Sequence, residues 1–230
     1  MIKIFKTGEL VDLAIPTEDF ALNSEWYDWF NRPELTRYLY WGDFKNTPEL
    51  QAEFFRNLTK DRKLFIIQTK NHLPCGVISF SKINFKTKSA DWAIVKDNDI
   101  EPENKRFSAL ESVALLIEHG FEDLGFSRIN AGQHSDLKGW QNRLELIGFK
   151  LEGIQEKKYI YDKETADTHS ISCQYEDYLK IKKFRGGKIW DGKIKMLERV
   201  NKLPKETLRK SLENFYKNER TNYYNKIFYL

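Results

Sequence analysis

Residues 103–126 read ENKRFSALESVALLIEHGFEDLGF, and their charged start leads directly into an apolar pattern. Apolar residues recur every three or four positions from Phe107, which predicts an amphipathic helix from about residue 104 to 124 that closes at Gly125. The free N–H groups and the dipole at a helix start favour a bound anion. The start of this helix contains no glycine. If an anion binds here, backbone N–H groups and basic side chains must hold it.

The segments around this helix predict a mixed α/β (α+β) fold. Strand-like segments show alternation and β-branched residues, and Thr47 followed by Pro48 marks a helix start. In chain order we predict a strand within 1–16, helices within 17–39 and 47–61, strands at 63–69, 74–83 and 89–96, the helix at 104–124, a strand at 127–134, a helix at 136–148 and a final hairpin within 149–177. The sheet should be mostly antiparallel, with about six or seven strands flanked by helices.

Composition restricts the class of protein. With 230 residues, 40% hydrophobic and 14% aromatic, the chain can form a sizeable core. Cys75 and Cys173 lie far apart without metal-ligand spacing, so we expect buried thiols in a reducing compartment and no metal site. The N-terminus lacks the apolar region of a signal peptide, and the longest apolar run, VALLI, is too short to span a membrane. We therefore expect a cytoplasmic protein.

The C-terminal part differs in charge from the rest. Residues 182–230 contain 14 Lys or Arg and 5 Asp or Glu, whereas the other residues contain 24 and 29. We predict a domain at 1–180 and a basic helical extension at 181–230. The extension has an apolar face, which favours packing on its own domain or on a second subunit, as in a homodimer. We expect it to bind neither nucleic acid nor membrane, although both were alternatives for a basic segment.

The ordered set of elements over residues 1–178 resembles the GNAT superfamily of acyl-CoA-dependent N-acetyltransferases. The motifs are WFNRPELTRYL, GVISFSKINFKTKSADWAIV, ALESVALLIEHGFEDLGFSRINA and NRLELIGFKLEG. The last two are similar to the cofactor helix and the closing turn of the ribosomal-protein-type branch. KSADWAIV and NRPELTRYL resemble acetyltransferases that act on amino-sugar nucleotides of bacterial surface-sugar pathways. The resemblance implies acetyl-CoA as the cofactor and a small-molecule primary amine, that of an amino-sugar nucleotide above all, as the acceptor.

The resemblance also implies where the cofactor binds. The pantetheine arm would pair with the backbone of the strand at 89–96, around Trp92, Ile94 and Val95. The pyrophosphate would lie at the start of the 104–124 helix, where the family's loop usually has Arg or Gln, two residues, Gly, one residue, and Gly or Ala. Only Ala109 fits that pattern. The expected phosphate contacts are the side chains or backbone amides of Lys105, Arg106, Phe107, Ser108, Ala109 and Leu110.

Acetyl transfer needs a neutral amine and a proton donor for the leaving thiolate. The resemblance implies a carboxylate near the acceptor at Asp91, at the start of the strand at 89–96. His134 ends the next strand, and its ordinary pKa of about 6.5 suits a base. Many family members use a tyrosine as the acid for the thiolate, and Leu144 occupies that position. The sequence therefore leaves the proton donor unassigned.

The acceptor would lie against the aromatic segment at 26–44, which contains three Trp and three Tyr. Aromatic rings stack on sugars and nucleobases. Trp29 and Tyr38 are spaced like core residues of a helix. The expected polar contacts are Asn31, Arg37 and Tyr40. Two alternatives stay open, namely a protein acetyltransferase acting on an N-terminus or lysine, and a non-catalytic GNAT-like interaction module.

Overall fold

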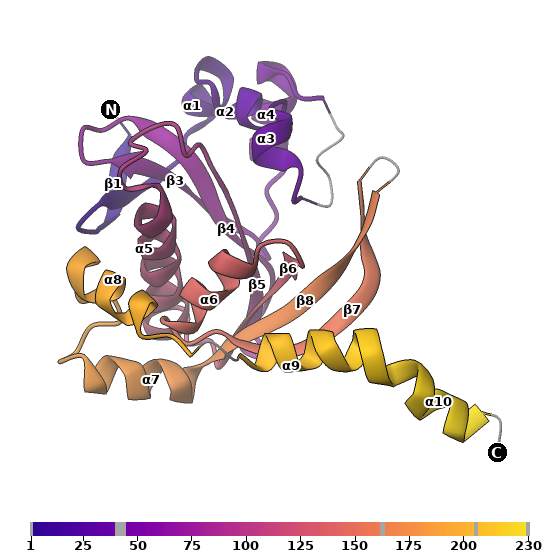
Figure 1. Cartoon of the computed structure of the whole chain (residues 1–230). Coiled ribbons are helices and arrows are strands. Elements are labelled where there is room, and N and C mark those ends of the chain that lie inside the picture. The colour runs from indigo at the N-terminus through magenta and orange to yellow at the C-terminus, as the bar shows by residue number, and fades with distance from the viewer. Residues whose placement is uncertain (1, 40–44, 162–163, 205–206, 229–230) are drawn as a thin grey trace.

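The computed structural model describes residues 2–39, 45–161, 164–204 and 207–228, apart from the side chains of Lys105 and Tyr161. Within them, eight strands form one sheet in the order β1-β2-β3-β4-β5-β6-β8-β7 (Figure 1). Neighbouring strands are antiparallel except β5 and β6, which are parallel. The strands are β1 (Lys3–Thr7), β2 (Val11–Ile15), β3 (Lys63–Thr69), β4 (Pro74–Asn84), β5 (Ser89–Lys96), β6 (Arg128–His134), β7 (Lys150–Tyr161) and β8 (Glu164–Gln174). The predicted fold class is confirmed.

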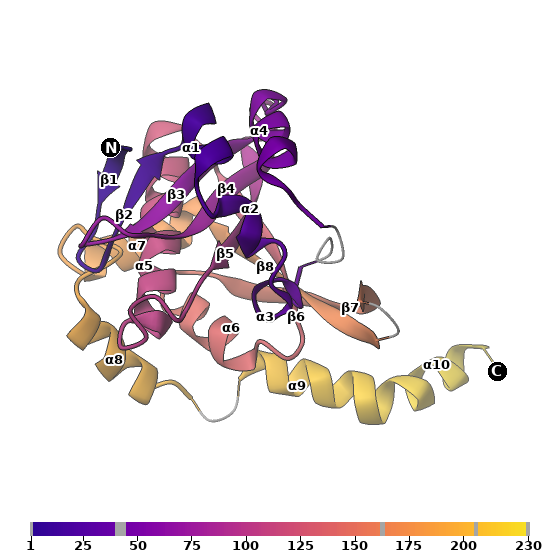
Figure 2. The same ribbon diagram turned by 90° about the horizontal axis from the view of Figure 1, so that it is seen from above.

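Helices lie on both faces of this sheet (Figures 1 and 2). Leu13, Phe65 and Ile78 belong to the large core beneath α5, whereas their neighbours in sequence pack in a second core with α1, α2 and α4. Successive side chains of a strand point to opposite faces, which is why short strands can serve both cores. The helices are α1 (Glu18–Asn23), α2 (Trp26–Trp29), α3 (Pro33–Thr36), α4 (Pro48–Arg56), α5 (Lys105–Glu118), α6 (Lys138–Glu145), α7 (Tyr175–Phe184), α8 (Lys193–Asn201), α9 (Leu208–Asn214) and α10 (Arg220–Phe228).

The N-terminal segment forms a hairpin, where the sequence predicted one strand. The Gly8 amide donates to the carbonyl of Val11 (2.9 Å) and closes a tight turn between β1 and β2. The carboxylate of Glu111 on α5 accepts the amides of Glu9, Leu10 and Val11 at 2.5, 2.7 and 3.1 Å. A side chain from 100 residues further along the chain therefore holds the turn, and a local pattern could not have revealed it.

The predicted helix at 104–124 is confirmed in extent, although its last part changes geometry. α5 continues at His119 into a π-helical turn that ends at Asp123. Gly125 follows with φ +69°, a conformation that glycine adopts without strain. Its backbone reversal brings the chain into β6.

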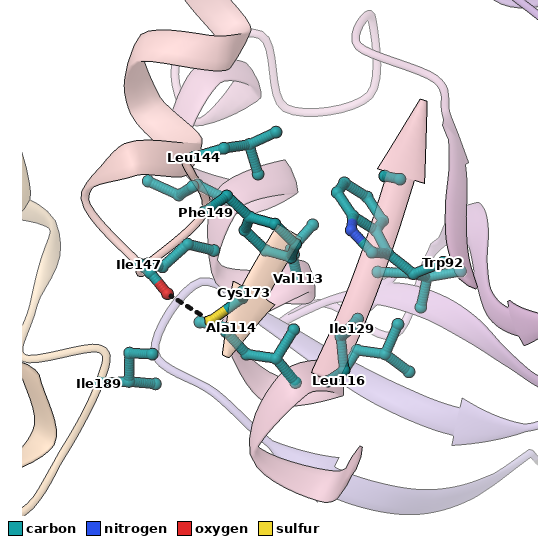
Figure 3. Packing of buried hydrophobic residues seen from close by; sticks show 14 of the residues in the cluster. Trp92, Val113, Ala114, Leu116, Ile129, Leu144, Ile147, Phe149, Cys173 and Ile189 are labelled. Carbon is teal, nitrogen blue, oxygen red and sulfur yellow. Dashed lines mark hydrogen bonds between the residues drawn. The ribbon is translucent and has the colours of Figure 1, made fainter. Parts of the chain in front are cut away.

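The region between α5, α6 and β8 is packed with apolar side chains (Figure 3). Leu144 is fully buried there, and the rings of Trp92 and Phe149 lie 5.5 Å apart between their centroids. Cys173 lies in the same cluster, with its Sγ 3.7 Å from the carbonyl of Ile147. Both cysteines are buried and free, as predicted. Leu144 therefore packs in the core and cannot donate a proton.

The C-terminal extension begins on the main domain and ends away from it. Ile189 and Met196, before and within α8, belong to the large core. α9 lies against β7, and α10 projects away from the domain toward the C-terminus (Figures 1 and 2). The division at residue 180 stays a prediction. Among the described residues, no helix combines the length and apolarity that crossing a membrane requires.

Candidate active site

The parallel strands β5 and β6 separate soon after they begin. They pair at three positions, the last being Asp91 with Asn130. On its other side β5 remains paired with β4 as far as Lys96, and β6 remains paired with β8 as far as His134. The facing edges beyond Asp91 therefore present backbone N–H and C=O groups to the gap between them. Such groups need partners, so this gap suits an extended ligand.

A cleft of about 440 Å³ occupies this gap and extends over the neighbouring helices. Its floor is the second half of β5 and the end of β6. Its walls come from α3 and the residues after it, from the first turns of α5, and from α6. The cleft therefore joins the strand edges to a helix N-terminus, which is the combination that the resemblance implied for the cofactor.

The residues expected to hold the cofactor divide into two groups. Those that line the cleft are Trp92, Ile94, Val95, Arg106 and Ala109. Those that point into the protein are Phe107, Ser108 and Leu110, which are 7%, 1% and 0% exposed. Positions three apart share a helix face, so Arg106 and Ala109 face the cleft while the intervening residues face the core. The side chain of Lys105 lies outside the described part of the chain.

The backbone at the start of α5 differs from the expectation. The amides of Phe107 and Ser108 donate to the carbonyl of Asn104 at 3.0 and 2.8 Å. These two amides already have a partner within the chain, so they are not free donors for the phosphate oxygens that were expected at residues 107–110. A helix leaves the amides of its first turn without intrahelical partners, and here that turn begins at Lys105.

Two arginines face the cleft without a counter-charge. Among the described residues, neither Arg106 nor Arg143 has a carboxylate within 4.0 Å, and both line the cleft. The Arg143 guanidinium lies over the ring of Trp140, 5.7 Å from its centroid, and its buried Nε has no hydrogen bond. Burial and the charge of Arg106 lower the pKa of Arg143. A bound anion would offset the repulsion between the two charges and could accept a hydrogen bond from Arg143.

The sequence analysis missed Trp140 and Arg143. Their spacing of three residues places them on one face of α6, and the helix orientation turns that face to the cleft. The adjacent Leu144 faces the core instead. The sequence did contain a signal for them. Trp140 and Arg143 are spaced to lie on one face of the predicted helix, and that face differs from the one that carries the apolar residues.

His134 lies in the cleft between two aromatic rings. Its ring centroid is 4.9 Å from that of Tyr38 and 4.5 Å from that of Tyr159. The amide of Asp136 donates to His134 Nδ1 at 3.1 Å, so the neutral ring carries its proton on Nε2. Burial is the main reason that the pKa of His134 is lowered, and its side chain is 8% exposed. At neutral pH His134 therefore presents an N–H donor.

Asp91 is not brought together with His134. Its carboxylate lies 2.8 Å from Lys82 Nζ and 3.4 Å from Asn130 Nδ2, in the first part of β5, where this strand is still paired with β6. It does not line the cleft. The resemblance placed Asp91 at the acceptor, whereas the strands diverge only after this residue.

The three residues expected to contact the acceptor are Asn31, Arg37 and Tyr40. The side-chain amide of Asn31 is occupied, because it donates to the carbonyl of Asn46 (2.9 Å) and accepts that residue's amide (2.7 Å). Arg37 lies over the ring of Tyr38 at 5.1 Å, and its charge contributes to the lowered pKa of His134. Tyr40 lies outside the described residues. Trp29 is core, as predicted, whereas Tyr38 lines the cleft.

Comparison with known proteins agrees with this geometry. Residues 17–150 match the family described as acetyltransferase (GNAT) domain, and the chain therefore belongs to that family of acetyl-CoA-dependent N-acetyltransferases. It is similar to the Vibrio cholerae spermidine N-acetyltransferase solved with CoA and spermine, at 13% identity and TM-score 0.67, over 75% of this chain and 99% of that one. It is also similar to a putative acetyltransferase structure, at 19% identity and TM-score 0.61, over 80% and 92%. At these identities the likeness concerns the fold. No curated protein sequence matches the chain.

Proposed function

We propose that the cleft between β5 and β6 is the site where this enzyme transfers an acetyl group from acetyl-CoA to a small primary amine, that of an amino-sugar nucleotide. The observation that carries the proposal is the early separation of β5 from β6. It leaves two facing strand edges unpaired beside the start of α5, and the resulting cleft contains His134 together with an aromatic and apolar wall.

The residues present fit the cofactor. The open edge of β5 from Trp92 to Lys96 offers backbone groups for the amides of the pantetheine arm. The start of α5, with Arg106, offers positive charge for phosphate groups. When bound there, acetyl-CoA supplies the acetyl group as an activated thioester.

His134 is better suited to donate a hydrogen bond than to act as the expected base. Its Nδ1 already accepts the Asp136 amide, so Nε2–H is the free polar group of the ring. An N–H donor in a partly desolvated cleft stabilises negative charge that develops on a carbonyl oxygen or a sulfur. The rings of Tyr38 and Tyr159 fix the orientation of the imidazole.

The acceptor wall favours a neutral amine on a flat or ring-shaped molecule. Leu35, Tyr38, Leu39 and Leu137 line this part of the cleft, and apolar surroundings favour the unprotonated amine. An amino sugar can also stack on the Tyr38 ring. We also propose, from the sequence motifs that resemble them, that the chain is close to the ribosomal-protein-type branch and its surface-sugar relatives.

A polyamine is the second candidate acceptor. Glu34 is the single carboxylate among the described residues that line the cleft, and it could pair with an ammonium group. The similar Vibrio cholerae structure is named as a spermidine N-acetyltransferase. One carboxylate beside several cations is a poor match for a ligand with three or four positive charges, so we rank the amino sugar first.

A thiol-release assay distinguishes these acceptors. The protein is mixed with acetyl-CoA and, separately, with amino-sugar nucleotides, spermidine, or peptides with a free N-terminus or lysine. We expect the largest kcat/KM with an amino-sugar nucleotide. A preference for spermidine would make the polyamine the acceptor, a preference for peptides would support the protein acetyltransferase alternative, and no release with any amine would contradict the proposed reaction.

A further inference from the structure

The phosphate end of a cofactor site must supply positive charge, and the start of α5 supplies less than a glycine-rich loop would. Phe107 and Ser108 donate their amides to Asn104, and the side chains at this turn leave no glycine for close approach of an anion. Arg106 is the one described basic side chain of α5 that lines the cleft. A second source of charge on another element would compensate for the missing backbone contacts.

Arg143 on α6 has the properties of that source. Its guanidinium is half-buried, lies over the ring of Trp140 and has no carboxylate partner among the described residues, and its buried Nε lacks any hydrogen bond. A half-buried guanidinium whose Nε has no hydrogen bond destabilises the ligand-free protein. Proteins retain such groups where a ligand of opposite charge binds, and the planar fork of arginine matches phosphate oxygens.

The two arginines also act on each other. Arg106 is close enough to Arg143 to disfavour its charged form, although they come from different helices. Like charges held together without an anion repel, whereas a doubly charged group between them would satisfy both. Both arginines line the same cleft, one from the start of α5 and one from α6, so a diphosphate bound in that part of the cleft can lie near both.

We propose that Arg143 and Arg106 form a two-arginine clamp for the diphosphate of CoA, in which side-chain charge replaces the glycine-rich backbone contacts. This inference rests on the proposed function. It adds Arg143, a residue on α6, to the cofactor site. It predicts that removing the charge of Arg143 weakens CoA binding but does not destabilise the ligand-free protein.

The test measures binding of CoA and of dephospho-CoA by titration calorimetry, together with thermal unfolding, for wild type and Arg143→Met. Methionine keeps an unbranched apolar stem over Trp140 and removes the charge. We expect the affinity for both ligands to fall about ten- to hundredfold, the effect of losing a charged hydrogen bond. We expect the ligand-free variant to unfold at the same or a higher temperature than wild type.

Two further variants complete the design. Arg143→Lys keeps the charge without the planar fork and should lose less affinity than Arg143→Met. Arg62→Met is the matched control, because Arg62 also stacks on an aromatic ring, that of Phe54 at 5.6 Å, and does not line the cleft. Its CoA affinity should equal that of wild type.

The outcomes separate the clamp from the wider proposal. If wild type binds CoA and Arg143→Met binds it equally well, the clamp is wrong while the proposed function stands. If only CoA, and not dephospho-CoA, loses affinity, Arg143 contacts the 3′-phosphate and the diphosphate assignment is wrong. If wild type binds neither ligand, both proposals fail. A less stable free Arg143→Met with unchanged affinity would show a purely structural role.

Discussion

Replacing Glu111 by alanine tests how the N-terminal hairpin is fixed to the cofactor helix. The Glu111 side chain is 1% exposed and accepts the amides of Glu9, Leu10 and Val11. The amides of Leu10 and Val11 are buried, whereas the turn at Glu9 is exposed enough for water to replace the lost bond. The alanine methyl group reaches none of these amides, so two buried donors lose their partner.

The expected loss follows from those two donors. Each buried amide without a partner costs about 1–3 kcal/mol, so the free energy of unfolding should fall by about 4 kcal/mol. For a chain of this size, this lowers the Tm by about 8–16 °C. Urea unfolding followed by tryptophan fluorescence measures the loss. Glu111→Gln keeps one acceptor oxygen, and because the same oxygen accepts both buried amides, this variant should lose much less than Glu111→Ala. A Glu111→Ala loss below about 1 kcal/mol would refute the reasoning.

Three other outcomes are expected. His134→Ala should lower kcat about 100-fold, the usual effect of removing one donor to developing charge, with the Kd for CoA nearly unchanged; an unchanged kcat would exclude His134 from the reaction. Burial lowers the pKa of His119, His134 and His169, so below pH 6.5 the unfolded chain binds protons that the folded chain does not. The Tm should therefore fall between pH 7.5 and 5.5, and His169→Gln should weaken that dependence; a Tm that rises on acidification would contradict the sign. Burial raises the pKa of Cys75 to about 11 and of Cys173 to about 12, so a disulfide reagent at pH 8 should label both only after unfolding. Rapid labelling of the native protein would show that they are accessible.

The central strands could be predicted because their signal is local. β3, β4 and β5 are short runs of apolar and β-branched residues between turn residues, and their predicted bounds agree with the structure to within a residue. The split of residues 1–16 into β1 and β2 was missed, because it depends on a carboxylate from α5. α8 was also missed, since its glycine-rich approach reads as a connector and its buried side depends on the distant core.

The sequence indicated where the site lies, but not which side chains line the cleft and which point into the core. The order of elements located the cofactor strand and helix, and Arg106 and His134 do line one cleft. Asp91 does not line this cleft, because β5 is still paired with β6 at this residue, and the length of that pairing cannot be read from either strand alone. Arg143 was overlooked, because the side of α6 that faces the cleft is known only once the packing of Leu144 in the core is known.

Hydrogen–deuterium exchange with and without CoA tests most directly whether the cofactor lies between β5 and β6. We predict that CoA slows exchange at residues 93–96, on the open edge of β5, and in the first turn of α5. Exchange in β1, at the far edge of the sheet, should stay the same. Binding of CoA that leaves residues 93–96 unprotected, or that protects only a distant region such as α10 and β7, would contradict the assignment of this cleft.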